Sequence, residues 1–126
     1  MGKNNKGRVL IVDDEDMNIS MLKLILSPEY AVYASTDGKD ALEAATEILP
    51  DIILLDIVMP EMDGYAVIAE LKKSEKTKDI PVIFLTGMTD SENEKKGLSL
   101  GAVDYILKPF TRDLILERVK YHLNVC

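Results

Sequence analysis

The sequence predicts an α/β fold in which helices cover both faces of a five-stranded parallel sheet, a doubly wound arrangement. Short apolar runs alternate with helical patterns along the whole chain, and such alternation implies right-handed βαβ crossovers. The central runs are continuously apolar, as parallel strands buried on both faces are. At 126 residues, of which 47% are hydrophobic, residues 1–126 fit one domain with its own core. The polar residues 1–7 are expected to form a flexible N-terminal extension.

Two strands and two helices are predicted in the first part of the chain. The first strand is expected at Val9–Val12, and the second, which is less apolar, at Tyr30–Ala34. The apolar residues between them that recur at helical spacing are Met17, Met21, Leu24 and Ile25. Thr36 or Asp37 is expected to cap a second helix. The apolar residues of this second helix are Ala41, Leu42, Ala45, Ile48 and Leu49.

Three strands and three helices are predicted in the remainder. Strands are expected at Ile52–Leu55, Val82–Leu85 and Tyr105–Leu107. A helix between the first two of these strands has as its inner face Val67, Ile68 and Leu71. The segment Thr89–Leu100 is mostly charged, so its helix has little apolar face. The last helix places on one face Ile115, Val119 and Leu123.

The composition of the strands predicts their order in the sheet. The second and fifth strands are more mixed than the others, which is typical of sheet edges. The order 2-1-3-4-5 follows, with the chain reversal between strands one and three. Ligand sites of open α/β sheets lie beyond the carboxyl ends of the strands at such a reversal.

Acidic residues follow the two strands that flank this reversal. Asp13 and Asp14 come after the first strand, and Asp56 comes after the third. Three carboxylates that lie close together repel one another unless they are protonated or bridged by a cation. Oxygen ligands suit Mg²⁺, or Mn²⁺ in its place. The alternative is that these acids only cap the next helix or begin a turn.

Other strand ends supply groups that suit phosphoryl transfer. Asp56 could be a nucleophile that forms an acyl phosphate. Thr86 ends the fourth strand with a hydroxyl, and Lys108 ends the fifth with an ammonium. A cis bond between Lys108 and Pro109 would turn the backbone and aim this ammonium inward. Taken singly, Thr86 could be an ordinary strand residue and Lys108 a solvated one.

Charge and cysteine content restrict the partners and the compartment. The formal net charge of −7 argues against nucleic acid as a direct partner. Cys126 is the only cysteine, so no disulfide can form within the chain, which suits the cytoplasm. No apolar stretch approaches the ~20 residues of a membrane span. We therefore expect a cytoplasmic protein with no membrane contact.

Four motifs, in this order, resemble the receiver domain of two-component response regulators, which has the CheY-like, flavodoxin-like (βα)5 fold. They are Val9–Asp14 (VLIVDD), Asp56–Gly64 (DIVMPEMDG), Val82–Thr86 (VIFLT) and Gly101–Phe110 (GAVDYILKPF). The resemblance covers essentially the whole chain. It implies that Asp56 accepts a phosphoryl group from a histidine kinase or phosphotransfer protein, in two-component signal transduction or a phosphorelay.

The resemblance also implies a role for each remaining site residue. Asp13 is the main metal carboxylate, Asp14 assists it, and Val58 lends its backbone carbonyl to the metal. Val58 is aliphatic where several relatives carry Asn, Lys or Glu, which bears on how long the phosphoryl group survives. Thr86 and Lys108 couple phosphorylation to a conformational switch, in which the aromatic side chain is Tyr105.

The expected output is a change in the surface formed by the fourth helix, fifth strand and fifth helix. That fourth helix contains Gly97 and should be held weakly. The surface would control an output partner or domain, and it could also support a homodimer.

Phosphorylation and slow autodephosphorylation would be self-catalysed, so the chain would be a switch and not a metabolic enzyme.

Three alternatives remain at this point. An aspartyl-phosphate phosphohydrolase would need a second acid two residues after Asp56, where this chain has Val58. A flavin-binding module would need a Ser, Thr or Gly-rich phosphate loop after the first strand, where this chain is acidic. A receiver-like docking module that is never phosphorylated would not require the acidic residues, Thr86 and Lys108 together.

Overall fold

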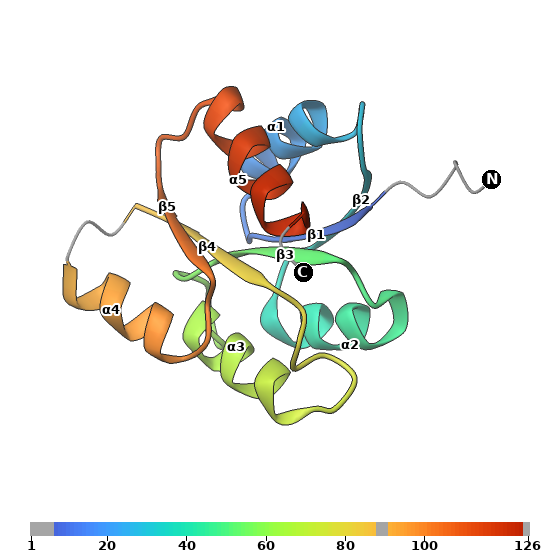
Figure 1. Cartoon of the computed structure of the whole chain (residues 1–126). Coiled ribbons are helices and arrows are strands. Elements are labelled where there is room, and N and C mark those ends of the chain that lie inside the picture. The colour runs from blue at the N-terminus through green and yellow to red at the C-terminus, as the bar shows by residue number, and fades with distance from the viewer. Residues whose placement is uncertain (1–6, 88–90, 125–126) are drawn as a thin grey trace.

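The computed structural model describes residues 7–87 and 91–124. Five strands alternate with five helices along the chain (Figure 1). The strands are β1 (Arg8–Val12), β2 (Ala31–Ser35), β3 (Ile52–Asp56), β4 (Val82–Thr86) and β5 (Asp104–Leu107). The helices are α1 (Asp16–Leu26), α2 (Gly38–Ile48), α3 (Gly64–Lys73), α4 (Ser91–Ser99) and α5 (Arg112–Asn124). Each expected strand is confirmed to within about one residue at either end.

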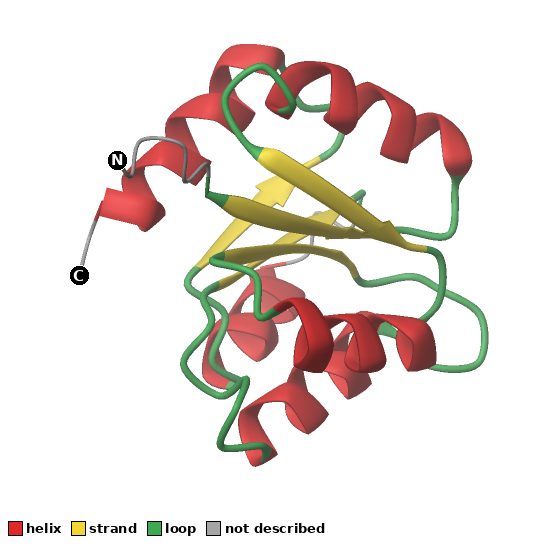
Figure 2. Cartoon of the chain, turned by 90° about the vertical axis from the view of Figure 1, so that its right-hand side faces the viewer, coloured by secondary structure: helices red, strands yellow, loops and turns green. Residues whose placement is uncertain are grey.

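The strands form one parallel sheet of order β2-β1-β3-β4-β5, as predicted. Figure 1 shows α1 and α5 on one face of this sheet and α2, α3 and α4 on the other. Turned by 90°, the same arrangement appears as three layers, with the sheet between two layers of helices (Figure 2). The fold is therefore doubly wound, and its core is split by the sheet into two apolar clusters.

Burial follows the predicted contrast between central and edge strands. All five residues of β3 and of β4 are buried, whereas β2 and β5 alternate between buried, intermediate and exposed residues. The predicted inner face of α3 is confirmed, and so is that of α5. Asp37 caps α2, since its side chain accepts a hydrogen bond of 2.8 Å from the Asp40 N–H.

Helix α1 buries a face other than the one that the spacing of Met17, Met21, Leu24 and Ile25 suggests. Its buried residues are Ile19, Leu22 and Leu26. Met17 is 80% exposed, Met21 46% and Leu24 78%, and only Ile25 of the four packs against the core. The helix carries two apolar stripes, and the second stripe leaves large apolar side chains on the surface.

Helix α4 packs against aromatic side chains of β4 and β5, and the residue at the contact is Gly97. A Cβ on Gly97 would lie 2.8 Å from the Phe84 ring and 3.9 Å from Tyr105. The Phe84 ring meets Tyr65 edge-on at 5.6 Å, and the Lys96 ammonium lies 4.4 Å from the centre of the Tyr65 ring. The absence of a side chain at Gly97 thus sets how closely α4 approaches β4.

Part of the predicted organisation lies outside the described residues. This applies to Thr89, to Cys126 and to residues 1–6 of the predicted N-terminal extension. Gly7 is described, and its carbonyl accepts a hydrogen bond of 2.8 Å from the Ala31 N–H. No helix in the described ranges is both long and apolar enough to cross a membrane.

Candidate functional site

The carboxyl ends of β1, β3 and β4 and the residue after β5 bring four predicted site residues to one edge of the sheet. Asp13 directly follows β1, Asp56 and Thr86 are the last residues of β3 and β4, and Lys108 directly follows β5. Asp13 is 1% exposed, Asp56 5% and Thr86 0%. Polar side chains this deeply buried need partners, and the geometry supplies several of them.

The three aspartates form a tight acidic cluster. One carboxylate oxygen from each of Asp13, Asp14 and Asp56 lies within 4.8 Å of the other two. Asp13 and Asp56 are buried and Asp14 is exposed, so the cluster opens to solvent on one side. Three like charges at this separation are unfavourable unless a cation or protons offset them.

Lys108 supplies a positive charge to the two buried members. Its Nζ lies 3.3 Å from Asp13 Oδ2 and 3.6 Å from Asp56 Oδ1. The Lys108–Pro109 peptide bond is cis, and the Lys108 N–H donates a 2.8 Å hydrogen bond to the Thr86 carbonyl. The ammonium is therefore shared between two carboxylates and neutralises neither completely.

The electrostatics of the cluster act most strongly on Asp56. Burial and the nearby Asp13 carboxylate raise the pKa of Asp56 from 3.8 to about 6. The Lys108 ammonium and a hydrogen bond from the Val58 backbone oppose this rise, and Asp14 adds a smaller increase. A pKa below neutrality leaves most Asp56 side chains ionised at pH 7, although their charge is poorly solvated.

The donor chemistry of the cluster fits a hard divalent cation. Mg²⁺ prefers oxygen ligands, keeps several of its waters and commonly binds through one or two carboxylates plus a phosphate. Asp13, Asp14 and Asp56 offer carboxylate oxygens only, and the exposed Asp14 leaves room for metal-bound water. The sequence predicts this set, and the structure brings it together.

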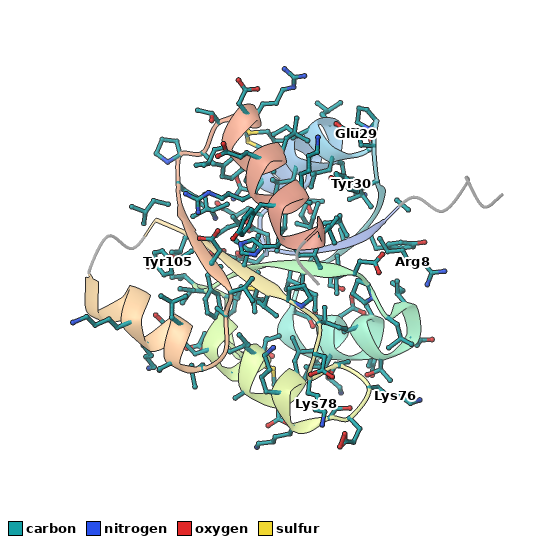
Figure 3. The ribbon with its side chains drawn as sticks, in the orientation of Figure 1. Arg8, Glu29, Tyr30, Lys76, Lys78 and Tyr105 are labelled. Atoms are coloured by element: carbon teal, nitrogen blue, oxygen red, sulfur yellow. The ribbon has the colours of Figure 1, made fainter. Side chains whose placement is uncertain are left out.

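The predicted switch residues occupy neighbouring strands. Thr86 is buried at the end of β4, and Tyr105 is half-buried on the edge strand β5, where Figure 3 labels it. Tyr105 pairs in register with Phe84, the residue on which α4 rests. Val58, two residues beyond Asp56, is 61% exposed.

Sequence reasoning missed the contribution of Asn18 to this site. The Asn18 side chain, in α1, donates hydrogen bonds of 3.2 Å to Asp13 Oδ2 and 2.9 Å to Glu15 Oε1. A polar residue five positions after Asp13, on the first turn of the following helix, was the available signal.

A surface hollow of about 350 Å³ lies beside the site. Its lining comes from α1 and from the segment after β5, and consists of Asn18, Met21, Lys108, Pro109 and Phe110. Met21 belongs to the exposed apolar stripe of α1, so this stripe reaches the edge of the hollow and its Lys108 wall.

Comparison with known proteins agrees with this geometry. Residues 9–120 match the family described as the response regulator receiver domain. The chain is 48% identical over 116 residues to a probable cyclic di-GMP phosphodiesterase of Vibrio cholerae. It is 40% identical over 114 residues to the response regulator PleD of Caulobacter vibrioides. These matches cover 92% and 90% of the chain but only 26% and 25% of the two relatives, so the chain spans about a quarter of their length.

A solved structure similar to this chain carries a metal in the equivalent fold. It is the receiver domain of a sensor histidine kinase from Pseudomonas aeruginosa, with a magnesium ion coordinated in its active site cleft. The two chains are 28% identical with a TM-score of 0.86, and the match covers 94% of this chain and 98% of the other. From its matched sequence, its sheet order and its acidic cluster, the chain belongs to the response regulator receiver domain family.

Proposed function

We propose that the chain is a cytoplasmic signalling switch in which Asp56 accepts a phosphoryl group from a phosphohistidine, with Mg²⁺ bound beside it. The donor would be a histidine kinase or a phosphotransfer protein. The observation that carries the proposal is the convergence of three carboxylates within 4.8 Å, with the Lys108 ammonium 3.6 Å from Asp56.

The reaction would be a displacement at phosphorus. An Asp56 oxygen attacks the phosphorus and forms the new P–O bond, while the P–N bond to the donor histidine breaks and the imidazole leaves with the electron pair. Lys108 would pair with a phosphoryl oxygen, and the Thr86 hydroxyl would donate to another. Both groups act on charge and position, which supply most of the catalysis in phosphoryl transfer.

The metal would be held by Asp13, Asp14 and Asp56 together with the Val58 backbone carbonyl. When bound, Mg²⁺ offsets the negative charge of the incoming phosphoryl oxygens. Asp13 and Asp14 would keep the negative charge that binds the cation while Asp56 changes from a free carboxylate to an acyl phosphate.

The exposed stripe of α1 would be the docking surface for the phosphodonor. Met17, Met21 and Leu24 lie at helical spacing and are 80%, 46% and 78% exposed, and Met21 lines the hollow beside Lys108. Exposed Met and Leu side chains are typical of surfaces that accept an apolar partner. A donor helix seated there would bring its phosphohistidine to the acidic cluster.

Phosphorylation would change the surface formed by α4, β5 and α5. Thr86 would move toward the phosphoryl group and Tyr105 would turn inward, which changes the surface on which an output partner or a second copy binds. The exposed apolar residues of these three elements and the loop before β5 are Leu98, Val103, Leu107 and Tyr121. An output partner that hydrolyses cyclic di-GMP, the activity in the name of the Vibrio relative, is the first to assay, because this chain matches only 26% of that relative.

The proposal is tested by intact mass after incubation with acetyl phosphate and Mg²⁺. We expect the native chain to gain the mass of one phosphoryl group and Asp56→Asn to gain none. Labelling of Asp56→Asn to the same extent, or no labelling of a native chain that binds Mg²⁺, would contradict the proposal. Sustained turnover of a phosphate ester would favour a phosphohydrolase instead.

The docking surface is tested separately by the source of the phosphoryl group. Met21→Glu should slow transfer from a phosphorylated histidine phosphotransfer protein and leave labelling by acetyl phosphate nearly unchanged, because the small molecule does not need the helix surface. Equal slowing with both donors would place the defect in the site itself.

The output is tested by amide exchange with and without beryllofluoride, a stable mimic of the phosphoryl group. We expect α4 and β5 to change their exchange rates when the mimic binds. Matching profiles would count against an output through this surface.

A further inference from the structure

The Asn18 side chain joins two carboxylates that no other described residue joins. Its Nδ2 lies 3.2 Å from Asp13 Oδ2 and 2.9 Å from Glu15 Oε1. An amide nitrogen carries two hydrogens, so both hydrogen bonds can form at once. Because ionised carboxylates only accept hydrogen bonds, the amide nitrogen and not its oxygen must face them.

Asp13 is thereby held through both of its oxygens. Its Oδ1 accepts a 2.9 Å hydrogen bond from the Glu15 N–H, and its Oδ2 faces Asn18 and Lys108. At 1% exposure, Asp13 has little solvent to orient it. A carboxylate has about four lone-pair positions, so these donors still leave room for a metal.

Asn18 and Lys108 differ in what they do to the charge of the site. Lys108 is cationic and is shared with Asp56 at 3.6 Å, so it would turn toward a phosphoryl group there. Asn18 is neutral, and it orients Asp13 without reducing the negative charge that attracts a cation. Once Lys108 engages the phosphoryl group, Asn18 is the side-chain donor that stays on Asp13 Oδ2.

We propose that Asn18 is a positioning residue that fixes the Asp13 carboxylate in the orientation required for Mg²⁺. The inference rests on the proposed function, because it assumes that the acidic cluster binds Mg²⁺. Groups that orient a metal ligand from behind contribute strongly to affinity, and their loss typically costs 10–100-fold. Mg²⁺ should be sensitive to this loss because it demands near-ideal octahedral geometry.

The test is calorimetric titration of Mg²⁺ and of Ca²⁺ into the full chain. Two variants remove the donor, Asn18→Leu with similar bulk and Asn18→Ala with less, and Ser20→Ala is the control at an exposed position of the same helix. We expect both Asn18 variants to bind Mg²⁺ about tenfold more weakly. Ca²⁺ should lose less affinity, because it tolerates irregular geometry, and Ser20→Ala should match the native chain.

Two results would overturn this inference and leave the proposed function standing. One is Mg²⁺ affinity within twofold of the native chain in both variants. The other is an equal loss for Mg²⁺ and Ca²⁺ accompanied by lower thermal stability of the metal-free chain, which would indicate a general packing role.

A further variant separates this inference from the proposed function. Asp13→Asn should reduce Mg²⁺ binding more than either Asn18 variant does. If Asp13→Asn binds Mg²⁺ as the native chain does, or the native chain binds none, the metal site itself is wrong and both proposals fall.

Discussion

Asp56 combines two properties that usually exclude each other, burial and ionisation near neutral pH. The side chain is 5% exposed, yet its pKa of about 6 keeps it mostly charged at pH 7. Burial and Asp13 raise this pKa, while Lys108 and the Val58 backbone limit the rise. A carboxylate that is ionised but poorly solvated is a better nucleophile than one surrounded by water. The residues around it therefore set its reactivity.

Val58 is the side chain best placed to influence loss of the phosphoryl group. It follows Asp56 by two residues and is 61% exposed, and its aliphatic side chain has no group that could orient an attacking water. We expect Val58→Asn to change the decay of the acyl phosphate, accelerating it by about three- to tenfold if the amide adds one hydrogen bond of ~1 kcal/mol to the attacking water. Phosphorylated chain is followed by intact mass after the phosphodonor is removed, and Val58→Ala serves as the control. Identical decay in the native chain and Val58→Asn would remove the idea.

Ser35 offers a test of buried polarity next to the site. It ends β2 at 2% exposure, and its Oγ is a buried side-chain atom without a hydrogen-bond partner among the described residues. A buried hydroxyl without a partner costs roughly 1–3 kcal/mol of desolvation. Ser35→Ala should therefore raise the free energy of unfolding by about 1 kcal/mol, measured by urea denaturation at constant m-value. A less stable variant would mean that an ordered water satisfies the hydroxyl.

At the scale of elements, α1 and α4 show what an apolar pattern cannot decide. Helix α1 has apolar residues on two faces, so periodicity alone does not say which face is buried. The β-branched Ile19 is buried, and the flexible Met17 and Met21 remain on the surface. Helix α4 has almost no apolar face, and its docking depends on the glycine against Phe84.

Gly97→Ala tests how α4 is seated. Alanine favours a helix over glycine by about 1 kcal/mol, but its Cβ would lie 2.8 Å from the Phe84 ring and force the helix outward. We expect faster amide exchange in residues 95–100, in spite of the gain in helix propensity. Gly87→Ala is the matched control, because a Cβ at Gly87 meets nothing within 4 Å. Slower exchange in Gly97→Ala would show that Phe84 yields easily.

The pairing of β5 with α5 should depend on pH through Asp104. Burial raises the pKa of Asp104, but hydrogen bonds from His122, Arg118 and the Tyr105 N–H, together with the charge of Arg118, outweigh burial and lower this pKa below 3.8. Arg118 Nη1 lies 2.8 Å and 2.7 Å from the two Asp104 oxygens, and His122 Nε2 lies 2.9 Å from Oδ2. The native state thus favours the ionised form. The stabilisation that ionised Asp104 gives to the native state is complete above the pKa of Asp104 in the unfolded chain. This stabilisation is lost as pH falls through the lower pKa of Asp104 in the native state.

Asp104→Asn should accordingly destabilise the fold by about 1–3 kcal/mol at pH 7. The difference from the native chain should shrink as the pH falls below 3.8 and through the lower native pKa, where Asp104 becomes protonated and so is uncharged, as asparagine is at every pH. Chemical denaturation across this range measures it, with Glu43→Gln at an exposed position of α2 as the control. A difference that does not change with pH would mean that the charge of Asp104 contributes nothing.

For the whole molecule, the acidic site lowers stability at the pH where it works. The native pKa of Asp56, about 6, lies above the unfolded value of 3.8. Between these values the native state binds more protons, so the stability of the metal-free chain falls as pH rises toward 6. Functional sites commonly reduce stability in this way.

Asp56→Asn should therefore be more stable than the native chain at pH 7 when metal is removed with EDTA. Loss of a buried charge beside Asp13 should raise the melting temperature by about 3–6 °C, equivalent to roughly 1 kcal/mol. The gain should vanish near pH 4, where Asp56 is protonated, and added Mg²⁺ should raise the melting temperature of the native chain more than that of the variant. A lower melting temperature for Asp56→Asn at pH 7 would contradict this account.

The sequence predicts most of the fold and of the site because the strands can be recognised from their apolar runs and the site residues lie where these strands end. Continuous apolar runs identify β1, β3 and β4, and parallel pairing brings their final residues together. The position of Asn18 on the first turn after Asp13 was a signal in the sequence, but its contacts also depend on the orientation of α1 relative to Asp13, which periodicity does not give. The position of α4 depends on the Phe84 ring packed against Gly97, and hydrophobic periodicity gives no information about this contact.

The pairing of Lys108 with Asp13 joins groups separated by 95 residues along the chain. During translation, the aspartates emerge long before their ammonium does, and β4 stays an open edge until β5 is added. A partly synthesised chain therefore holds carboxylates without the cation that balances them. Under the proposed function, a chain that lacks β5 would also lack the ammonium that pairs with the phosphoryl group, so phosphorylation would require the completed sheet.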